Sequence, residues 1–293
     1  MNLHIYEVFR LNSSGILYFW ATLIEYMVTV RILGGLGNQM FQYAYAKSLQ
    51  HLGYKVQLDL SAIKKYTLHG GYQLDKFQID LSEASNSQVL FAKLNVYNTF
   101  KERSLLFHES FLKLPKRSYV KGYFQTEKYF HQIRTDILNQ FQLKQAFSQN
   151  ALTYLEAIKE ASSSCSIHIR RGDYVSNKSA QEVHGSCSLD YYQRAISKIL
   201  EIAKNTQFFI FSDDLEWVKS NLEVPNPTFV DIQGIPHEDM LLMSKCDHNI
   251  TANSSFSWWG AWLNTNPNKI VISPKQWYVS KENEIVPETW IKL

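Results

Sequence analysis

The chain has 293 residues, of which 45% are hydrophobic and 14% aromatic, and its formal net charge at pH 7 is +3. This composition indicates a globular protein with a large apolar core and excludes a disordered or fibrous chain. This net charge is too small to indicate nucleic acid or an acidic membrane surface as a partner, although peripheral contact with a membrane stays possible.

The cysteines and the N-terminal residues indicate in which cellular compartment the protein is located. Three cysteines are an odd number and form no CxxC pair, which favours free thiols in a reducing compartment over a disulfide framework or a zinc site. The apolar stretch 15–33 is interrupted by Glu25 and Arg31, and no secretory cleavage site is apparent. We therefore expect a cytoplasmic protein, free or at the inner face of the cytoplasmic membrane, with residues 1–27 as an N-terminal extension of uncertain role.

The first half of the chain predicts an α/β unit in which a strand, a glycine-rich turn, a helix and a second strand follow one another. The turn is GGLGNQ, and the helix after it ends at Gly53, a residue typical of helix C-termini. Thr126 is expected to cap a later helix. The expected strands cover 28–33, 55–60 and 118–125, and the expected helices cover 39–53 and 126–141.

The second half is more regular, because short apolar strands alternate with helical segments. This alternation predicts right-handed crossovers and a parallel sheet. The expected strands cover 165–170, 207–212, 228–231, 248–251 and 269–273, and the expected helices start near Leu189 and cover 214–222, 237–246 and 254–263. A boundary near 142–164 predicts two α/β lobes, at 28–150 and 151–293, with a cleft between them.

Ligands of such sheets bind at the carboxyl ends of the strands, and polar residues gather there in this chain. The adjacent Arg170 and Arg171 repel each other, so we expect an anion between them, and the planar guanidinium fork suits phosphate oxygens. Ser254 and Ser255 open a helix whose N-terminal amides also favour an anion. A diphosphate pocket is therefore predicted from residues that end or follow the strands: Gly35, Gly37, Asn38, Arg170, Arg171, Asp173, Asn253, Ser254 and Ser255.

Each of these features also has a purely structural reading. The glycines of GGLGNQ can serve the turn alone, Ser254 can be an ordinary helix cap, and the arginines can form an ion pair with Asp173. Asp213 and Asp214 read either as a metal-binding pair or as acids at a helix start. Because GGLGNQ is not GxGxxG, it speaks against a nicotinamide-dependent enzyme, which remains a third alternative.

Three segments in this order and spacing resemble the bacterial α-1,2-fucosyltransferases of glycosyltransferase family 11: GGLGNQMFQYAYAKSL, HIRRGDYV and ITANSSFSWWGAWLN. The resemblance runs from about Val28 to the C-terminus. It implies a GT-B fold, with an acceptor-side lobe at 28–150 and a Rossmann-like GDP-fucose lobe at 151–293. It also implies inverting transfer of L-fucose from GDP-β-L-fucose to the 2-hydroxyl of a terminal β-galactoside, on an oligosaccharide or glycolipid, without metal or other cofactor.

The resemblance also implies residue roles. His168 and Asp239 should contact the guanine, and Arg171, Asp173 and Asn38 should lie at the reacting groups. Asp173 is the first candidate for the general base, ahead of Glu182 and His184, but it can equally orient Arg171. The pyrophosphate should be bound by Arg170 and Arg171 together with Asn253, Ser254, Ser255, Gly35 and Gly37.

Two alternatives to this function stay open at this stage. The chain can be a GDP-sugar or glycan-binding protein without turnover, or an inverting fucosyltransferase of another acceptor linkage. The sequence does not identify the acceptor. Tyr66, Tyr72 and Phe77 can stack on a galactose ring or belong to the core.

Overall fold

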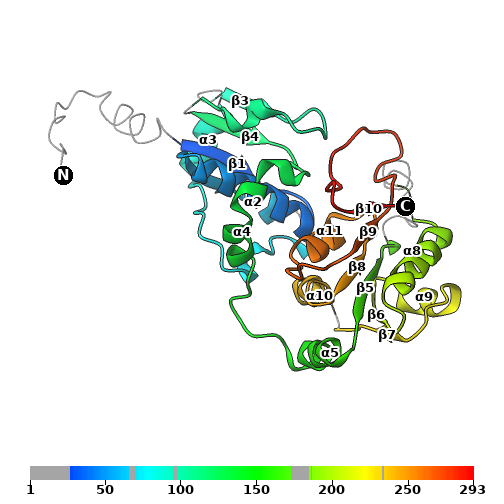
Figure 1. Ribbon diagram of the computed structural model, residues 1–293. Helices are drawn as coiled ribbons and strands as arrows, with labels where there is room; N and C mark the ends of the chain where they lie inside the picture. Colours follow the sequence, from blue (N-terminus) through cyan, green and yellow to red (C-terminus); the bar gives the residue numbers. More distant parts are fainter. Residues whose placement is uncertain are drawn as a thin grey trace, which may run out of the picture.

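The computed structural model describes residues 27–65, 70–94, 98–115, 117–172, 185, 187–232 and 234–293. Two parallel sheets organise them, a four-stranded sheet of order β2-β1-β4-β3 and a six-stranded sheet of order β10-β9-β8-β5-β6-β7 (Figure 1). The predicted α/β class with two parallel sheets is confirmed. None of the helices in the described ranges has the length and apolar character needed to cross a membrane.

The first sheet follows the predicted strand-turn-helix-strand order, with one difference at the turn. The helix α2 already begins at Leu36, so Gly37 and Asn38 lie in its first turn instead of in a loop. Gly34, at φ +93°, makes the reversal that a residue with a side chain rarely adopts. The elements of this part are β1 (Met27–Arg31), α2 (Leu36–His51), β2 (Lys55–Asp59), α3 (Asn86–Lys93), β3 (Asn98–Lys101) and β4 (Ser118–Lys121), with short 3₁₀ turns at Ile63–Lys65, Leu74–Lys76 and Glu109–Leu112.

The predicted single helix at 126–141 is wrong. Thr126 does cap, but only the 3₁₀ turn η5 (Glu127–Tyr129), and after η6 (His131–Ile133) only α4 (Arg134–Gln140) is α-helical. The break falls at Phe130, whose φ of −141° is not helical. Its ring stacks on Trp259 with centroids 5.5 Å apart, so tertiary packing overrides local helix preference here.

The second sheet contains all five predicted strands and a short sixth strand at the C-terminus that the pattern did not show. Its elements are α5 (Gln149–Glu160), β5 (Ser164–Ile169), α8 (Leu189–Ile202), β6 (Gln207–Ser212), α9 (Leu215–Asn221), β7 (Pro227–Phe229), α10 (Pro236–Met243), β8 (His248–Ile250), α11 (Ser255–Trp262), β9 (Val271–Ser273) and β10 (Ile291–Lys292). The expected lobe boundary at 150/151 falls inside α5, which packs against α10 of the second sheet, and the division into lobes stays a prediction.

The helices α2 and α11 pack against each other between the two sheets (Figure 1). Their closest approach is at Gly37, where an added Cβ would lie 2.5 Å from the carbonyl carbon of Ser255. The indole N–H of Trp259 donates to the Gly37 carbonyl at 2.9 Å, and Phe41 packs on the rings of Trp258 and Trp259. The tryptophans of α11 and Phe77 are therefore core residues.

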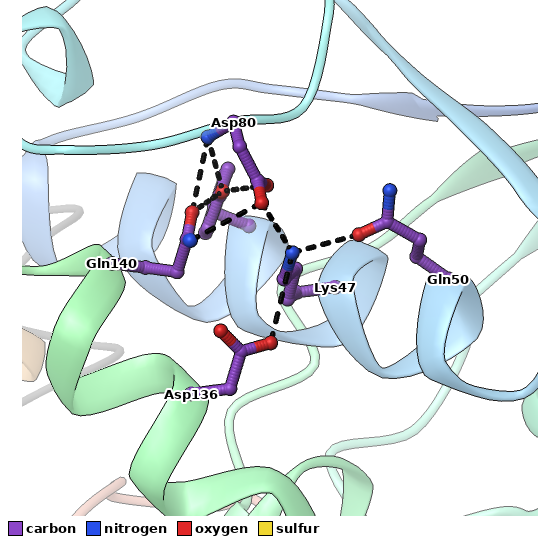
Figure 2. Close-up of polar contacts among 6 residues, drawn as sticks. Lys47, Gln50, Asp80, Asp136 and Gln140 are labelled. Carbon is purple, nitrogen blue, oxygen red and sulfur yellow. Dashed lines mark hydrogen bonds and ion pairs between the residues drawn. The ribbon is translucent and has the colours of Figure 1, made fainter.

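A buried lysine fixes the other end of α2 (Figure 2). The ammonium group of Lys47, a side chain that is 9% exposed, donates to Asp80 at 2.6 Å and to Gln50 at 2.8 Å. It also lies 3.6 Å from a carboxylate oxygen of Asp136 on α4. Because a charge this buried is costly without partners, the network explains why α2, α4 and the chain at Asp80 keep one arrangement.

We predict that Gly37→Ala destabilises the fold by about 1–3 kcal/mol, because the new methyl group meets the backbone of α11, which cannot yield without moving a core helix. Chemical unfolding measures the change. His51→Ala, at an exposed position on the same helix, is the control and should be neutral. Equal stability of the two variants would contradict this account of the contact.

Candidate active site

Strand β5 lies in the interior of the second sheet and brings its C-terminal residues next to those of β6. The register pairs Ile169 with Ser212, so the arginines after β5 face the aspartates after β6. Arg170 Nη1 lies 3.0 Å from Asp213 Oδ2, and Arg171 Nε lies 3.4 Å from Asp214 Oδ2. These acids offset the repulsion between the two guanidinium groups.

Asp213 also shapes the backbone after β5. Its carboxylate accepts from the N–H groups of Arg171 at 2.9 Å and Gly172 at 3.0 Å. The Arg171 guanidinium lies over the Trp217 ring, 3.5 Å from its centroid. Asp213 and Asp214, which the sequence left open as a metal-binding pair, are thus partners of the two arginines. The contact between Arg171 and Trp217 was not predicted from the sequence.

The helix N-termini of α2 and α11 lie close together, since Gly37 in the first turn of α2 touches Ser255 in the first turn of α11. Ser254 is the N-cap of α11, and its hydroxyl accepts from the Phe256 N–H at 3.3 Å. Gly35 is the N-cap residue of α2 and makes no side-chain cap. Two sets of N-terminal amides, each favouring an anion, therefore adjoin one another.

Asn253 is buried, and its amide group donates to the carbonyls of Gly185 at 3.2 Å and Trp277 at 3.4 Å. This side chain holds two loops against the start of α11, a structural role that the sequence did not indicate. Its predicted contact with pyrophosphate stays a prediction.

Two of the predicted site residues carry buried polar atoms without a hydrogen-bond partner among the described residues: His168 Nδ1 and Asp239 Oδ1. His168 is the second-last residue of β5, and its ring centroid is 5.4 Å from that of Phe256. Asp239 lies on α10, which packs against both α11 and β5. Because buried polar atoms are normally paired, these two atoms are candidates for contact with a ligand.

Burial sets the charge of both groups. It lowers the pKa of His168 to about 4, and the neighbouring Arg170 adds to this shift. Burial also raises the pKa of Asp239 to about 7, with smaller contributions from Asp231 and Glu238. At neutral pH the imidazole is therefore uncharged, and Asp239 can gain or lose a proton as its surroundings change.

Asn38 belongs to a chain of hydrogen bonds that connects the two sheets. Its side-chain oxygen accepts from the amide of Gln125 at 2.7 Å, and the Gln125 oxygen accepts from the Tyr278 hydroxyl at 2.5 Å. Gln125 and Tyr278 are further residues that the sequence analysis missed. Gln125 closes the segment predicted as strand 118–125, and Tyr278 lies in a loop without any pattern.

The structure therefore brings together most of the predicted site. Arg170 and Arg171 follow β5 directly, and His168 within β5 contacts Phe256 in the first turn of α11, next to Ser254 and Ser255. Gly37 joins the first turn of α2 to this group. The candidate bases Asp173, Glu182 and His184, as well as Tyr66 and residues 1–26, lie outside the described residues.

These features define an α/β protein with two parallel sheets and a pair of arginines, each held by an aspartate, at the carboxyl edge of the second sheet. The sequence profile named Glycosyl transferase family 11 matches residues 18–293, so the match begins ahead of Val28. The chain belongs to this family of glycosyltransferases.

Relatives with assigned names agree with this membership. An alpha-1,2-colitosyltransferase of Escherichia coli is 37% identical over 91% of this chain and 99% of that protein. The O-antigen biosynthesis glycosyltransferase WbnK of Escherichia coli is 32% identical over 89% of this chain and 98% of its own length. The mouse galactoside 2-alpha-L-fucosyltransferase Sec1 is 24% identical over 82% of this chain and 65% of that protein.

We predict that Asp239→Asn stabilises the ligand-free protein in a pH-dependent way. The raised pKa of Asp239 means that its contribution to stability is fully present below about pH 4 and is lost as pH rises through about 7. Asparagine cannot ionise, so the variant should match the wild type near pH 4 and exceed it by about 2–4 kcal/mol near pH 8 in urea unfolding.

Asp190→Asn is the control for this experiment. Its carboxylate is largely exposed on α8, and its loss should change stability little at any pH. If Asp239→Asn and wild type unfold alike near pH 8, the Asp239 carboxyl is not buried as described.

Proposed function

We propose that the protein is an inverting α-1,2-fucosyltransferase, which moves L-fucose from GDP-β-L-fucose to the 2-hydroxyl of a terminal β-galactoside. The observation that carries this proposal is the pair Arg170 and Arg171 at the carboxyl edge of the second sheet, directly after the strand whose His168 packs on Phe256 in the first turn of α11. Membership in the family and the names of the relatives support the reaction class and the α-1,2 linkage.

The unpartnered atoms of His168 and Asp239 support a guanine nucleotide. An ionised Asp239 can accept from the N1–H and exocyclic amine of guanine, and adenine offers no such pair of donors. In the ligand-free protein this carboxyl has a pKa of about 7, and binding of guanine would favour its charged form. The neutral imidazole of His168 would add one further donor or acceptor.

The chemistry depends on charge that develops on the leaving group. Cleavage of the bond between C1 of fucose and the phosphate oxygen leaves an oxocarbenium-like sugar and a GDP that gains about one negative charge. Arg170 and Arg171 would stabilise this charge, with the hydroxyls and amides at the start of α11. Because Asp213 and Asp214 already orient the arginines, little reorganisation is needed during the reaction.

The acceptor then attacks from the face opposite GDP, which gives the α-fucoside by inversion. Asn38, whose side-chain oxygen accepts from Gln125, would orient the reacting groups. Asp173 remains the first candidate for the base that removes the proton of the 2-hydroxyl, followed by Glu182 and His184. The proposal includes transfer without a metal ion. It also includes a location in the cytoplasm or at the inner face of the cytoplasmic membrane.

A second donor is favoured by one specific finding, the 37% identity to an alpha-1,2-colitosyltransferase. Colitose is L-fucose without its 3-hydroxyl, so both donors present the same GDP and the same C1 to the arginines. Discrimination would depend on a partner for that hydroxyl, since a site built to hydrogen-bond it rejects the deoxy sugar.

We predict that Arg171→Ala lowers kcat/KM for transfer by about a hundredfold, about 3 kcal/mol, since one preorganised contact to the leaving group is lost. The side chain is partly exposed, so circular dichroism and thermal unfolding should show a folded variant. Arg194→Ala on α8, whose arginine pairs with Asp190 at the surface, is the matched control and should transfer normally. Full activity of Arg171→Ala would refute the assignment of the site.

The function itself is tested by incubating the protein with lactose, EDTA and either GDP-fucose or GDP-colitose, with the linkage determined by NMR. We expect α-1,2-fucosyllactose to form with EDTA present. Faster transfer of colitose would decide for the second donor, and an absolute need for Mn²⁺ would contradict catalysis by arginines alone. Nucleotide binding without any product would favour a binding protein.

A further inference from the structure

A pocket of about 760 Å³ opens at the carboxyl edge of the first sheet, away from the arginine pair. Residues that end or follow β1, β3 and β4 line it, together with the loop at 281–282. Two of the lining residues are acidic, Glu102 and Glu282. Five are basic: Arg31, Lys101, Arg103, Lys121 and Lys281.

Strand register sets three of these cations side by side. Lys101 of β3 pairs with Lys121 of β4, and the pairing of Val30 with Val120 places Arg31 on the other side of Lys121. Like charges on directly neighbouring strand positions are destabilising. Burial lowers the pKa of Lys121, and Arg31 and Lys101 are among the charges that add to this effect.

Within the described ranges, no carboxylate lies within 4.0 Å of any of the five cations. Glu102, which lines the pocket, is engaged elsewhere: it accepts from the N–H of Tyr123 at 2.6 Å and of Phe124 at 3.1 Å. This contrasts with Arg170 and Arg171, which each have an aspartate partner. The pocket thus carries an excess of positive charge, because its five cations outnumber the two lining carboxylates.

The pocket also adjoins the proposed reaction centre. Gln42, one turn after Asn38 on α2, lines it and donates to the Gly122 carbonyl at 3.0 Å. Lys281, which also lines the pocket, comes three residues after Tyr278. Tyr278 belongs to the hydrogen-bond chain that runs through Gln125 to Asn38. A sugar chain whose terminal residue reached Asn38 could extend into this pocket.

We propose that this pocket binds an acidic group of the acceptor, a carboxylate or a phosphate, so that the enzyme takes anionic glycans. The inference rests on the proposed function and adds a substrate class to it. Concavity favours a single group that enters the pocket over an extended charged surface, and several converging cations suit an anion with two or more oxygens.

Four acceptors with the same terminal β-galactose test this: lactose, Gal-β-1,4-glucuronate, and lactose phosphorylated on the glucose at O6 or at C1. Calorimetry in the presence of GDP gives Kd, and fucosyl transfer gives KM. We expect at least one charged acceptor to bind about tenfold more tightly than lactose, an advantage that high salt removes. The carboxylate and phosphate arms identify the kind of acidic group.

The double variant Arg103→Gln with Lys281→Gln should raise the Kd of the charged acceptor close to the Kd of lactose. The Kd of lactose should not change. Both side chains are exposed, so the fold should persist. The matched control, Arg194→Gln with Lys198→Gln, removes two exposed cations from α8 and should change neither value.

The two proposals fail in different ways. Transfer to lactose without preference for any charged acceptor, in Kd or KM, would overturn the acidic-acceptor inference alone. Absence of transfer to every acceptor would overturn the proposed function, and the Kd values measured by calorimetry would still decide whether the pocket selects an acidic group.

Discussion

The contact between the first turns of α2 and α11 is the constraint on which the rest of the structure depends. Gly37 allows the two helix N-termini to approach so closely that a single methyl group would collide with the backbone of Ser255. One helix belongs to each sheet, so this contact determines how the sheets meet. The same approach brings the first turns of two helices together, and His168 of β5 packs on Phe256 in one of them, so the geometry of the proposed anion site depends on core packing.

Charge is handled in two ways at the two sheet edges. After β5, Asp213 and Asp214 pair with Arg170 and Arg171 and hold them in place. Such support is needed where cations must keep one position during a reaction. At the edge of the first sheet, Lys121 and its neighbours have no such partners among the described residues. A small net charge for the whole chain conceals both arrangements.

Sequence reasoning predicted parallel sheets and the chain segments that form most of their strands, because apolar strands that alternate with helices favour parallel crossovers. The predictions failed where tertiary contacts determine the local structure. Thr126 caps only a short 3₁₀ turn, which ends at Phe130 because the Phe130 ring packs on Trp259. Arg170 and Arg171 were identifiable because adjacent cations need a counter-charge. The partners Asp213 and Asp214 were not, because strand register, which sequence spacing does not show, brings them there.

The loop between β9 and β10 has a mechanical consequence. Tyr278 bonds to Gln125, and Glu284 lies 2.8 Å from Lys128 and accepts from the Phe107 N–H, while Trp277 is held by Asn253 of the second sheet. This loop is therefore a tether across the two halves. A hinge motion that separates the two halves has to break some of these bonds, so this one loop limits how far the enzyme can open between turnovers.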